Sequence, residues 1–479
     1  MSLRKQATAG LVWTFAQQFS NQIIAFVVSI ILARLLLPEQ FGLVGMVAVF
    51  VAIGRSLMDA GLTQSLIRDK DADQEDLSTV FFFNLVASSV IYLLIFFSAP
   101  LIAKFYEEPS LTKIVRVLCL TFVVSAFGAI QSTRLTKVMN FKTQTLISVP
   151  STVVSGIVGV SMAYSGFGVW SLVWSRVSAS LMRTVQLWIY SKWAPSFQFS
   201  IPKFKDHFNF GYKLTLSGLL DTIFSNIYII IIGKYFATSQ VGFYVKSQSL
   251  KNLPVSNISN ALNKVTYPLF AQIQDDNIRL KRVYQQIMQM VVFIIAPVLI
   301  FAAVLAEPTF RFLLTEKWLP AVPYFQILCV SGILYPLNSY NLNVLKVKGR
   351  SDLFLKLEII KKVLIVIGIV IAIQFGIMAL LYTQAILSIV AFYINSYNTD
   401  KFINYSSWEQ TKDIFPIIFI GLVSGAVIYI ADGFMEQVGW LDIIRILLGS
   451  ILGLVTYMTF SFIFKKDVVI FFKKIILKK

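Results

Sequence analysis

The most constraining feature of this 479-residue chain is a succession of long apolar stretches that fills it from end to end. A hydrocarbon layer about 30 Å thick takes about 20 apolar residues of helix. Fourteen stretches reach that length: residues 11–33, 41–66, 79–103, 111–135, 145–165, 167–190, 209–233, 240–268, 284–306, 321–345, 355–374, 376–398, 413–432 and 440–464. They are longer than barrel strands and lack strand alternation. Hydrophobic residues make up 57% of the chain and charged residues 14%, which is too little charge to coat a soluble protein. We therefore predict an all-α integral membrane protein with about fourteen transmembrane helices.

The basic residues give this chain an orientation. Lys and Arg number 42 against 24 Asp and Glu, which leaves a net charge of +18. If the N-terminus lies in the cytoplasm, 28 of the 42 fall in cytoplasmic segments, 7 in outer segments and 7 within spans. Cytoplasmic loops of membrane proteins are enriched in Lys and Arg. We therefore predict that both termini are cytoplasmic and that the positive charge marks topology, so a nucleic-acid partner is not expected.

Two segments 200 residues apart resemble each other, which indicates an internal repeat. Arg34–Gly42 and Lys234–Gly242 share a basic residue, a Gln and a Gly at matching positions, and further matches follow at offsets of 208 and 210. Chance likeness between apolar stretches is the alternative. Six helices per repeat insert both copies the same way up, as in one plan of transporter. We predict an N-terminal six-helix lobe at 1–200 and a C-terminal six-helix lobe at 201–400. Residues 401–479 then form two additional transmembrane helices and a basic cytoplasmic tail.

Polar residues within the spans identify a candidate binding site. A basic residue at mid-bilayer costs about 2.5–3.5 kcal/mol on insertion scales, so most should face a polar interior or reach the membrane surface. The candidate cations for cargo binding are Arg55, Arg176, Arg183, Lys246 and Lys251. Amide side chains accompany them at Gln18, Asn21, Gln22 and Asn226. Cations suit phosphate or carboxylate, and amides suit sugars, so the pattern favours a large, anionic and hydroxylated cargo.

Each of these residues also has a plainer interpretation. Arg176 and Arg183 share one helical stripe, which suggests an external anion, but both could instead extend toward the cytoplasm. Arg55 and Asp59 are four residues apart and could form a structural pair on one helix face. Asp59 and Asp221 are embedded acids that could couple transport to an ion. Polar side chains in membranes also commonly join helix to helix by hydrogen bonds.

The remaining chemistry-bearing residues point away from catalysis. Cys119 and Cys329 lie inside apolar stretches, where we expect two buried free thiols. The single histidine, His207, lies at a predicted helix edge, where we expect it to be solvated. The sequence shows no metal-ligand cluster, nucleotide-binding loop or nucleophile motif. We therefore predict a protein that is not an enzyme and uses no metal and no cofactor.

Three segments near the N-terminus resemble a known family. They are Gly10-Leu-Val-Trp-Thr-Phe-Ala-Gln-Gln-Phe-Ser-Asn-Gln, Leu32-Ala-Arg-Leu-Leu-Leu-Pro-Glu-Gln-Phe-Gly-Leu and Met58-Asp-Ala-Gly-Leu. They are similar to the Wzx-type polysaccharide flippases of bacteria, in particular the colanic acid and teichuronic acid exporters. That family belongs to the multidrug/oligosaccharidyl-lipid/polysaccharide (MOP) superfamily, with the MATE multidrug exporters and the lipid II flippase. The resemblance implies a MATE-like pair of lobes related by pseudo-two-fold symmetry around a central cationic cavity.

The resemblance also implies a function. It suggests that the protein moves undecaprenyl-pyrophosphate-linked oligosaccharide across the bacterial inner membrane by alternating access, for O-antigen, capsule or exopolysaccharide biosynthesis. The implied partners are the lipid-linked oligosaccharide, membrane lipids and a polysaccharide polymerase. The family has no single agreed motif, so the resemblance assigns no site residue.

Two other functions are open from the sequence. A MATE-like multidrug or cation antiporter would prefer an acidic cavity. A membrane-embedded glycan polymerase would need a sizeable outer loop, whereas predicted outer connections such as 165–167 and 374–376 are very short.

Overall fold

The computed structural model describes residues 3–464, apart from the side chains of residues 3–9, 11, 213, 214, 217 and 260–265. That range contains α-helices and two short 3₁₀ helices and no strand. The predicted basic tail at 465–479 lies outside the described residues. The helices are α1 (Leu3–Leu35), α2 (Pro38–Met58), α3 (Leu62–Arg68), α4 (Gln74–Tyr106), α5 (Leu111–Lys137), α6 (Phe141–Tyr164), α7 (Val169–Ser191), α8 (Ile201–Ser225), α9 (Ile227–Tyr235), α10 (Thr238–Gln272), α11 (Asn277–Val304), α12 (Ala306–Leu314), η1 (Glu316–Ala321), α13 (Val322–Val347), α14 (Ser351–Ala372), η2 (Ile373–Phe375), α15 (Ile377–Ile403), α16 (Ser407–Gln437) and α17 (Asp442–Phe464).

All fourteen predicted stretches fall on helices, but fewer of them pass a strict test for membrane spans. Within the described residues, ten helices are long and apolar enough to cross a membrane. The bent pair 218–225 and 227–235, which meets at 42°, would make an eleventh. The stretches outside this count are α7, α10 and α14, which carry arginines, amides or closely spaced charges. The prediction of an all-α chain is confirmed, and the number fourteen stays a prediction.

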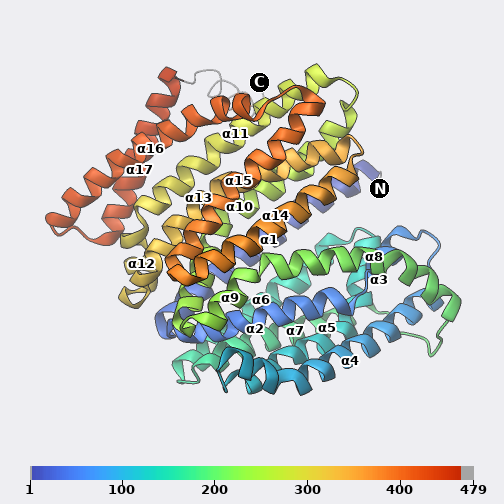
Figure 1. Cartoon of the computed structure of the whole chain (residues 1–479). Helices are drawn as coiled ribbons and strands as arrows, with labels where there is room; N and C mark the ends of the chain where they lie inside the picture. The colour runs from blue at the N-terminus through green and yellow to red at the C-terminus, as the bar shows by residue number, and fades with distance from the viewer. Residues whose placement is uncertain (1–2, 465–479) are drawn as a thin grey trace. The chain divides into compact units, whose positions relative to one another are not determined.

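The chain forms two compact units, residues 1–245 and 246–479. In unit 1, α4 packs along α5, and α6 lies between α1 and α7; these helices run from blue to green in Figure 1. In unit 2, α13 packs on α15, and α16 packs on α11 and α17. The boundary falls inside α10 rather than at the predicted lobe boundary near residue 200. A division by contacts does not locate a sequence repeat, so the predicted lobes stay a prediction.

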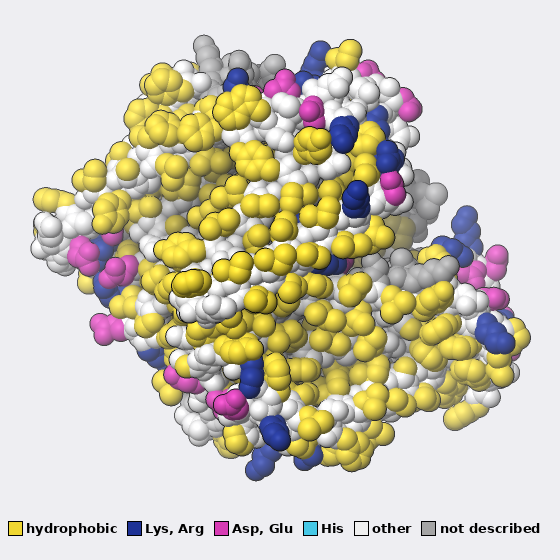
Figure 2. Space-filling model, viewed as in Figure 1, with side chains coloured by type: hydrophobic (Ala, Val, Ile, Leu, Met, Phe, Trp, Pro, Cys, Tyr) yellow, Lys and Arg dark blue, Asp and Glu magenta, His cyan; other side chains and the backbone are white. Residues whose placement is uncertain are grey.

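The outward faces of the helices are apolar. On α4, Leu94, Phe97 and Leu101 are 62%, 71% and 68% exposed, and their spacing of three and four residues places them on one helix face. On the face shown in Figure 2, apolar side chains cover the middle of the helices, and charged side chains gather toward the helix ends. A surface of this kind is stable against hydrocarbon and unstable in water.

A break between α2 and α3 shapes the part of unit 1 that holds the candidate site. Pro38 starts α2, where its fixed φ suits the first helical turn. After Met58 the chain leaves the helix, and Ala60 and Gly61 take φ values of 45° and 74°. Glycine is required at position 61 because the backbone of Gly211 in α8 lies directly against it. The predicted single stretch 41–66 is therefore two helices with a sharp turn between them.

The two segments matched in the predicted repeat meet each other in unit 1. A side chain on Gly42 would collide with the backbone carbonyl of Thr238, and one on Gly242 would collide with that of Pro38. The contact is reciprocal, because Gly42 and Gly242, like Pro38 and Thr238, occupy equivalent positions 200 residues apart. The first turns of α2 and α10 therefore pack backbone to backbone, which only residues without a Cβ allow.

Candidate functional site

A cavity of about 1060 Å³ lies within unit 1, lined by α2, α3, α5, α6 and α7. Its walls are held by short polar contacts between helices. Ser155 and Ser175 hydroxyls lie 2.8 Å apart and join α6 to α7. Thr184 of α7 donates to the carbonyl of Val124 in α5 at 2.9 Å. These bonds hold α7 in position, and α7 supplies two of the cavity's cations.

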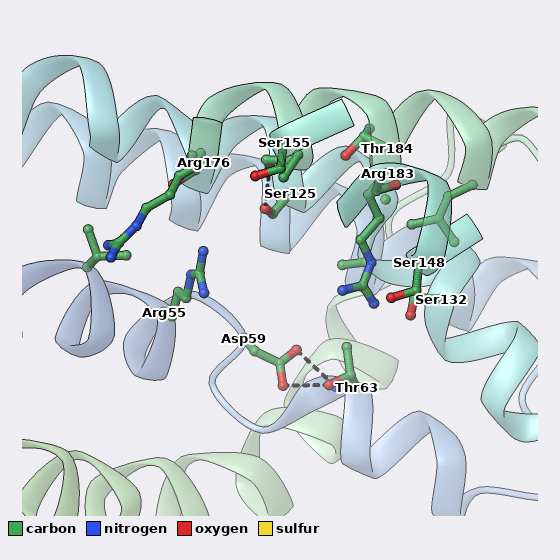
Figure 3. A pocket seen from close by; sticks show the side chains of 18 of the residues that line it. Arg55, Asp59, Thr63, Ser125, Ser132, Ser148, Ser155, Arg176, Arg183 and Thr184 are labelled. Atoms are coloured by element: carbon green, nitrogen blue, oxygen red, sulfur yellow. Dashed lines mark hydrogen bonds between the residues drawn. The ribbon is translucent and has the colours of Figure 1, made fainter. Parts of the chain in front are cut away.

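Three arginines from two helices face this cavity. Arg55 stands in the last turn of α2, where a cation is favoured by the helix dipole. Arg176 and Arg183 lie two turns apart on α7, a rise of about 10.5 Å. Figure 3 shows Arg55 and Arg176 extending from opposite walls, with Arg183 farther along the cavity. The predicted stripe on α7 is therefore present, and its arginines share a cavity with Arg55.

None of the three arginines forms an ion pair or hydrogen bond with another described residue. The fourth charged residue of the lining, Asp59, accepts hydrogen bonds from the amide of Thr63 at 3.2 Å and from its hydroxyl at 2.5 Å. The pairing of Arg55 with Asp59 that we considered is wrong. Asp59 is the C-cap residue of α2, and its carboxylate is bound by the amide and hydroxyl of Thr63 in α3 instead of by Arg55. The cavity therefore presents unpaired positive charge.

Hydroxyl groups form most of the remaining polar lining. They come from Thr63, Thr121, Ser125, Ser132, Thr133, Thr136, Ser148, Ser151, Thr152, Ser155, Ser180 and Thr184. Of these residues, only Ser180 shares the stripe of Arg176 and Arg183 that the sequence predicts. The sequence does contain a pattern that indicates the hydroxyl-rich wall on α6. One face of this helix carries hydroxyl residues at helical spacing, namely Ser148, Ser151, Thr152 and Ser155. Such hydroxyls donate and accept hydrogen bonds, as sugar hydroxyls do.

The predicted amides of α1 stand beside the cavity rather than in it. Asn21 donates to the hydroxyl of Ser148 at 2.7 Å and accepts from that of Thr152 at 3.0 Å. Both partners line the cavity, so Asn21 joins α1 to the cavity wall. Neither Gln18 nor Gln22 is among the lining residues. For Asn21, the structure therefore shows the helix-to-helix role that we gave as the alternative.

Other predicted site residues lie elsewhere. Lys246 and Lys251 belong to unit 2, where both are buried. The Lys246 ammonium lies 5.8 Å from the ring centre of Trp318, and the stem of Lys251 packs beside Gly332. A cargo-binding role for either lysine stays a prediction.

The last two candidates lie on the bent span. Asn226 stands at the break between α8 and α9 and donates to the carbonyl of Thr222 at 2.8 Å. Asp221 is exposed on α8. Neither lines the cavity of unit 1, and their roles in binding and ion coupling stay predictions.

Two further expectations concern single residues. Cys119 and Cys329 are free and buried, as we predicted. The prediction that His207 is solvated is wrong. Only 5% of His207 is exposed, because it packs against Ser65 and Asp76 from distant parts of the sequence.

The fold is that of a known class of membrane transporters. The lipid II flippase MurJ in an inward closed conformation matches with a TM-score of 0.78, covering 96% of this chain and 100% of that chain at 15% identity. An inward-facing multidrug resistance MATE family transporter of the MOP superfamily matches with a TM-score of 0.61, covering 81% and 96% at 16% identity. The expected MATE-like fold is confirmed.

The chain belongs to the family described as polysaccharide biosynthesis protein, whose profile matches residues 31–323. The teichuronic acid biosynthesis protein TuaB of Bacillus subtilis (strain 168) is 27% identical over 82% of each chain. The lipopolysaccharide biosynthesis protein WzxC of Escherichia coli (strain K12) is 24% identical over 78% of this chain and 76% of its own. The Wzx-like assignment within the MOP superfamily is confirmed. The protein is thus a multi-pass membrane transporter of polysaccharide biosynthesis and not an enzyme.

Proposed function

We propose that this transporter is a flippase that moves undecaprenyl-pyrophosphate-linked oligosaccharide from the cytoplasmic to the outer leaflet of the bacterial cytoplasmic membrane. The observation that carries the proposal is the cavity of unit 1, where Arg55, Arg176 and Arg183 lie unpaired among a dozen hydroxyl groups. A pyrophosphate linked to a glycan has the complementary chemistry, with a compact anion next to many hydroxyls.

The three arginines can each bind phosphate oxygens through two parallel N–H donors. Charge-assisted bonds of this kind strengthen where water is partly excluded. The Ser and Thr side chains of α5 and α6 then offer donors and acceptors to the sugars. The polyprenyl chain stays in the hydrocarbon of the bilayer, so only the head group needs a polar path.

In the proposed cycle, the site is exposed to one leaflet at a time by movement of the two predicted lobes, as in other transporters built from parallel repeats. Both chain termini lie in the cytoplasm, in keeping with the distribution of Lys and Arg. No covalent bond forms or breaks. Asp59 and Asp221 are the acids that we propose for coupling to an ion.

The proposal is tested by depleting the protein in the bacterium that encodes it and measuring its lipid carriers. We expect a completed lipid-linked oligosaccharide to accumulate on the inner leaflet while surface polysaccharide falls. Unchanged lipid carriers, together with altered resistance to cationic drugs, would reject the flippase and favour the antiporter.

A further inference from the structure

A second polar cluster lies in unit 1, on α3, α4 and α8. It contains His207, the only histidine of the chain. The Nδ1 atom of His207 lies 2.8 Å from the Ser65 hydroxyl, and its Nε2 atom lies 3.3 Å from a carboxylate oxygen of Asp76. The three residues are 5%, 4% and 7% exposed. A carboxylate oxygen of Asp69 completes the group, and the ligand atoms of Asp69, Asp76 and His207 all lie within 4.8 Å of one another.

The cluster holds more negative than positive charge. The ammonium of Lys203 lies 2.7 Å from Asp73, 3.2 Å from Glu75 and 3.1 Å from Asp76, so one cation faces three carboxylates. Asp69 forms no ion pair with a described residue; one of its oxygens accepts the amide of Asp71 at 3.0 Å. An imidazole beside two carboxylates in an acidic surrounding is a setting that favours a bound cation.

We propose that His207, Asp69 and Asp76 bind a divalent transition-metal ion of the Zn²⁺ type, with water as the fourth ligand. Zn²⁺ bonds of about 2.0–2.1 Å in a tetrahedron place ligand atoms about 3.3 Å apart. The Nε2 of His207 and the Asp76 oxygen already have that separation. Asp69 is only partly buried at the end of α3, and its oxygen needs to approach by no more than about 1.5 Å.

Ser65 supplies the outer contact that such a site requires. A metal-binding histidine usually donates its other ring N–H to an oxygen, which fixes the ring and its tautomer. The Ser65 hydroxyl accepts that bond from Nδ1 when Nε2 holds the metal. The metal would then fasten α3 to α4 and α8. Because Thr63 and Ile67 of α3 line the arginine cavity, it would also brace one wall of that cavity, whatever cargo the cavity binds.

The test uses the purified full-length chain without an affinity tag, treated with EDTA, in a Cys119→Ala/Cys329→Ala background that removes the thiols. We expect titration with ZnCl₂ to give one bound ion per chain and to raise the Tm. His207→Ala and Asp69→Asn should each weaken Zn²⁺ binding at least tenfold. Asp69→Asn also covers the case in which His207→Ala fails to fold, because Asp69 is only partly buried.

Two control variants separate a metal site from a purely hydrogen-bonded cluster. Asp71→Asn, an exposed acid of the same loop, should bind Zn²⁺ as the parent does. Lys203→Met should bind at least as tightly as the parent, because the ammonium that competes for Asp76 is gone. The proposal is overturned if no stoichiometric Zn²⁺ binds, if His207→Ala and Asp69→Asn bind unchanged, or if Lys203→Met binds more weakly. None of these readouts depends on transport, so they stand apart from the proposed flippase function.

Discussion

Placing a basic residue within a membrane protein costs free energy, and the cavity of unit 1 contains three: Arg55, Arg176 and Arg183. On insertion scales each basic residue at mid-bilayer costs about 2.5–3.5 kcal/mol, and no described acid offsets any of them. Residues with a purely structural role would gain stability from an acidic partner, as Arg445 does with Asp432 at 2.9 Å in unit 2. Unpaired cations in a cavity instead suit the proposed role of binding an anion that arrives from outside.

This arrangement predicts the effect of removing the arginines. Arg55→Ala/Arg176→Ala should reduce transport of lipid-linked oligosaccharide at least a hundredfold, because two charge-assisted phosphate contacts are lost, at about 1.5–3 kcal/mol each. Lys at both sites should restore part of the activity, since it keeps the charge but loses the paired donors. The measurement is surface polysaccharide in a depleted strain, with membrane levels of each variant checked by immunoblot. The matched control is Arg279→Ala, an exposed arginine of unit 2. Normal export by the correctly inserted double alanine variant would refute the arginine site.

A second residue-scale prediction concerns pH. Hydrogen bonding to Lys203 lowers the pKa of Asp73, and the same bond raises the pKa of Lys203. The stability from Asp73 is therefore complete above its unfolded pKa of about 3.9 and is lost as the pH falls through the lower folded value. In EDTA, the Tm difference between wild type and Lys203→Met should stay constant from about pH 5 to 9 and shrink below about pH 4. Lys205→Met, its exposed neighbour, should show no such pH dependence. A difference that keeps its full size at pH 3 would exclude this pair as the cause.

At the scale of elements, the reciprocal contact of Gly42 and Gly242 links a sequence pattern to packing. From the sequence alone, the Gln-x-Gly match at an offset of 200 indicates an internal repeat and says nothing of packing. In unit 1 each glycine lies against the backbone of the opposite first turn, at Thr238 and at Pro38. The two matching segments therefore pack against each other, and both glycines of the match lie in this one close contact between α2 and α10.

This contact predicts a loss of stability on enlarging either glycine. Gly42→Ala and Gly242→Ala should each destabilise by about 1–3 kcal/mol, because a methyl group cannot enter a backbone contact without separating the helices. Gly433→Ala is the matched control. Gly433 lies inside α16 with no atom near its missing Cβ, and alanine there should be neutral or stabilising by up to about 1 kcal/mol. Thermal denaturation in detergent measures all three. If Gly42→Ala matches Gly433→Ala, the proposed contact does not limit packing.

The elements also show what could be predicted from the sequence. Apolar length located the long helices but not the short α12 and η1, because membrane helices must be long and must satisfy their backbone internally. It did not show the breaks at Gly61 and Asn226, since apolar residues resume directly after both. The arginine stripe of α7 follows from local spacing and was predicted. The surroundings of His207 were not, because Ser65 and Asp76 reach it only through the packing of α3, α4 and α8.

At the scale of the whole molecule, we interpret the net charge of +18 mainly as a sign of orientation in the membrane. Most Lys and Arg residues fall in alternate connections, and one end of unit 1 illustrates this. The loop after α3 begins behind Arg68 and contains Lys70. A hydrogen bond from Gln74 to the carbonyl of Ala194 joins this end of α4 to the connection after α7. The connection between α4 and α5 lies at the other end of those helices and contains Glu107 and Glu108, with Lys104 and Lys113 in the helix turns beside it. The distribution of Lys and Arg over the whole chain, read with the positive-inside rule, predicts that the first end lies in the cytoplasm.

This orientation predicts which loops a membrane-impermeant maleimide can reach. The test uses a Cys119→Ala/Cys329→Ala background, which removes the two buried native thiols. Ser110→Cys, exposed between α4 and α5, should then react in intact cells. Asp71→Cys, exposed between α3 and α4, should react only after the membrane is permeabilised. The two sites lie at opposite ends of α4 and therefore on opposite sides of the membrane. If the orientation is reversed, the labelling of both sites is exchanged, which inefficient labelling of one site cannot produce. Labelling of Asp71→Cys in intact cells, with Ser110→Cys protected, would contradict the predicted orientation and place the termini outside. The direction of transport proposed above would then also be contradicted.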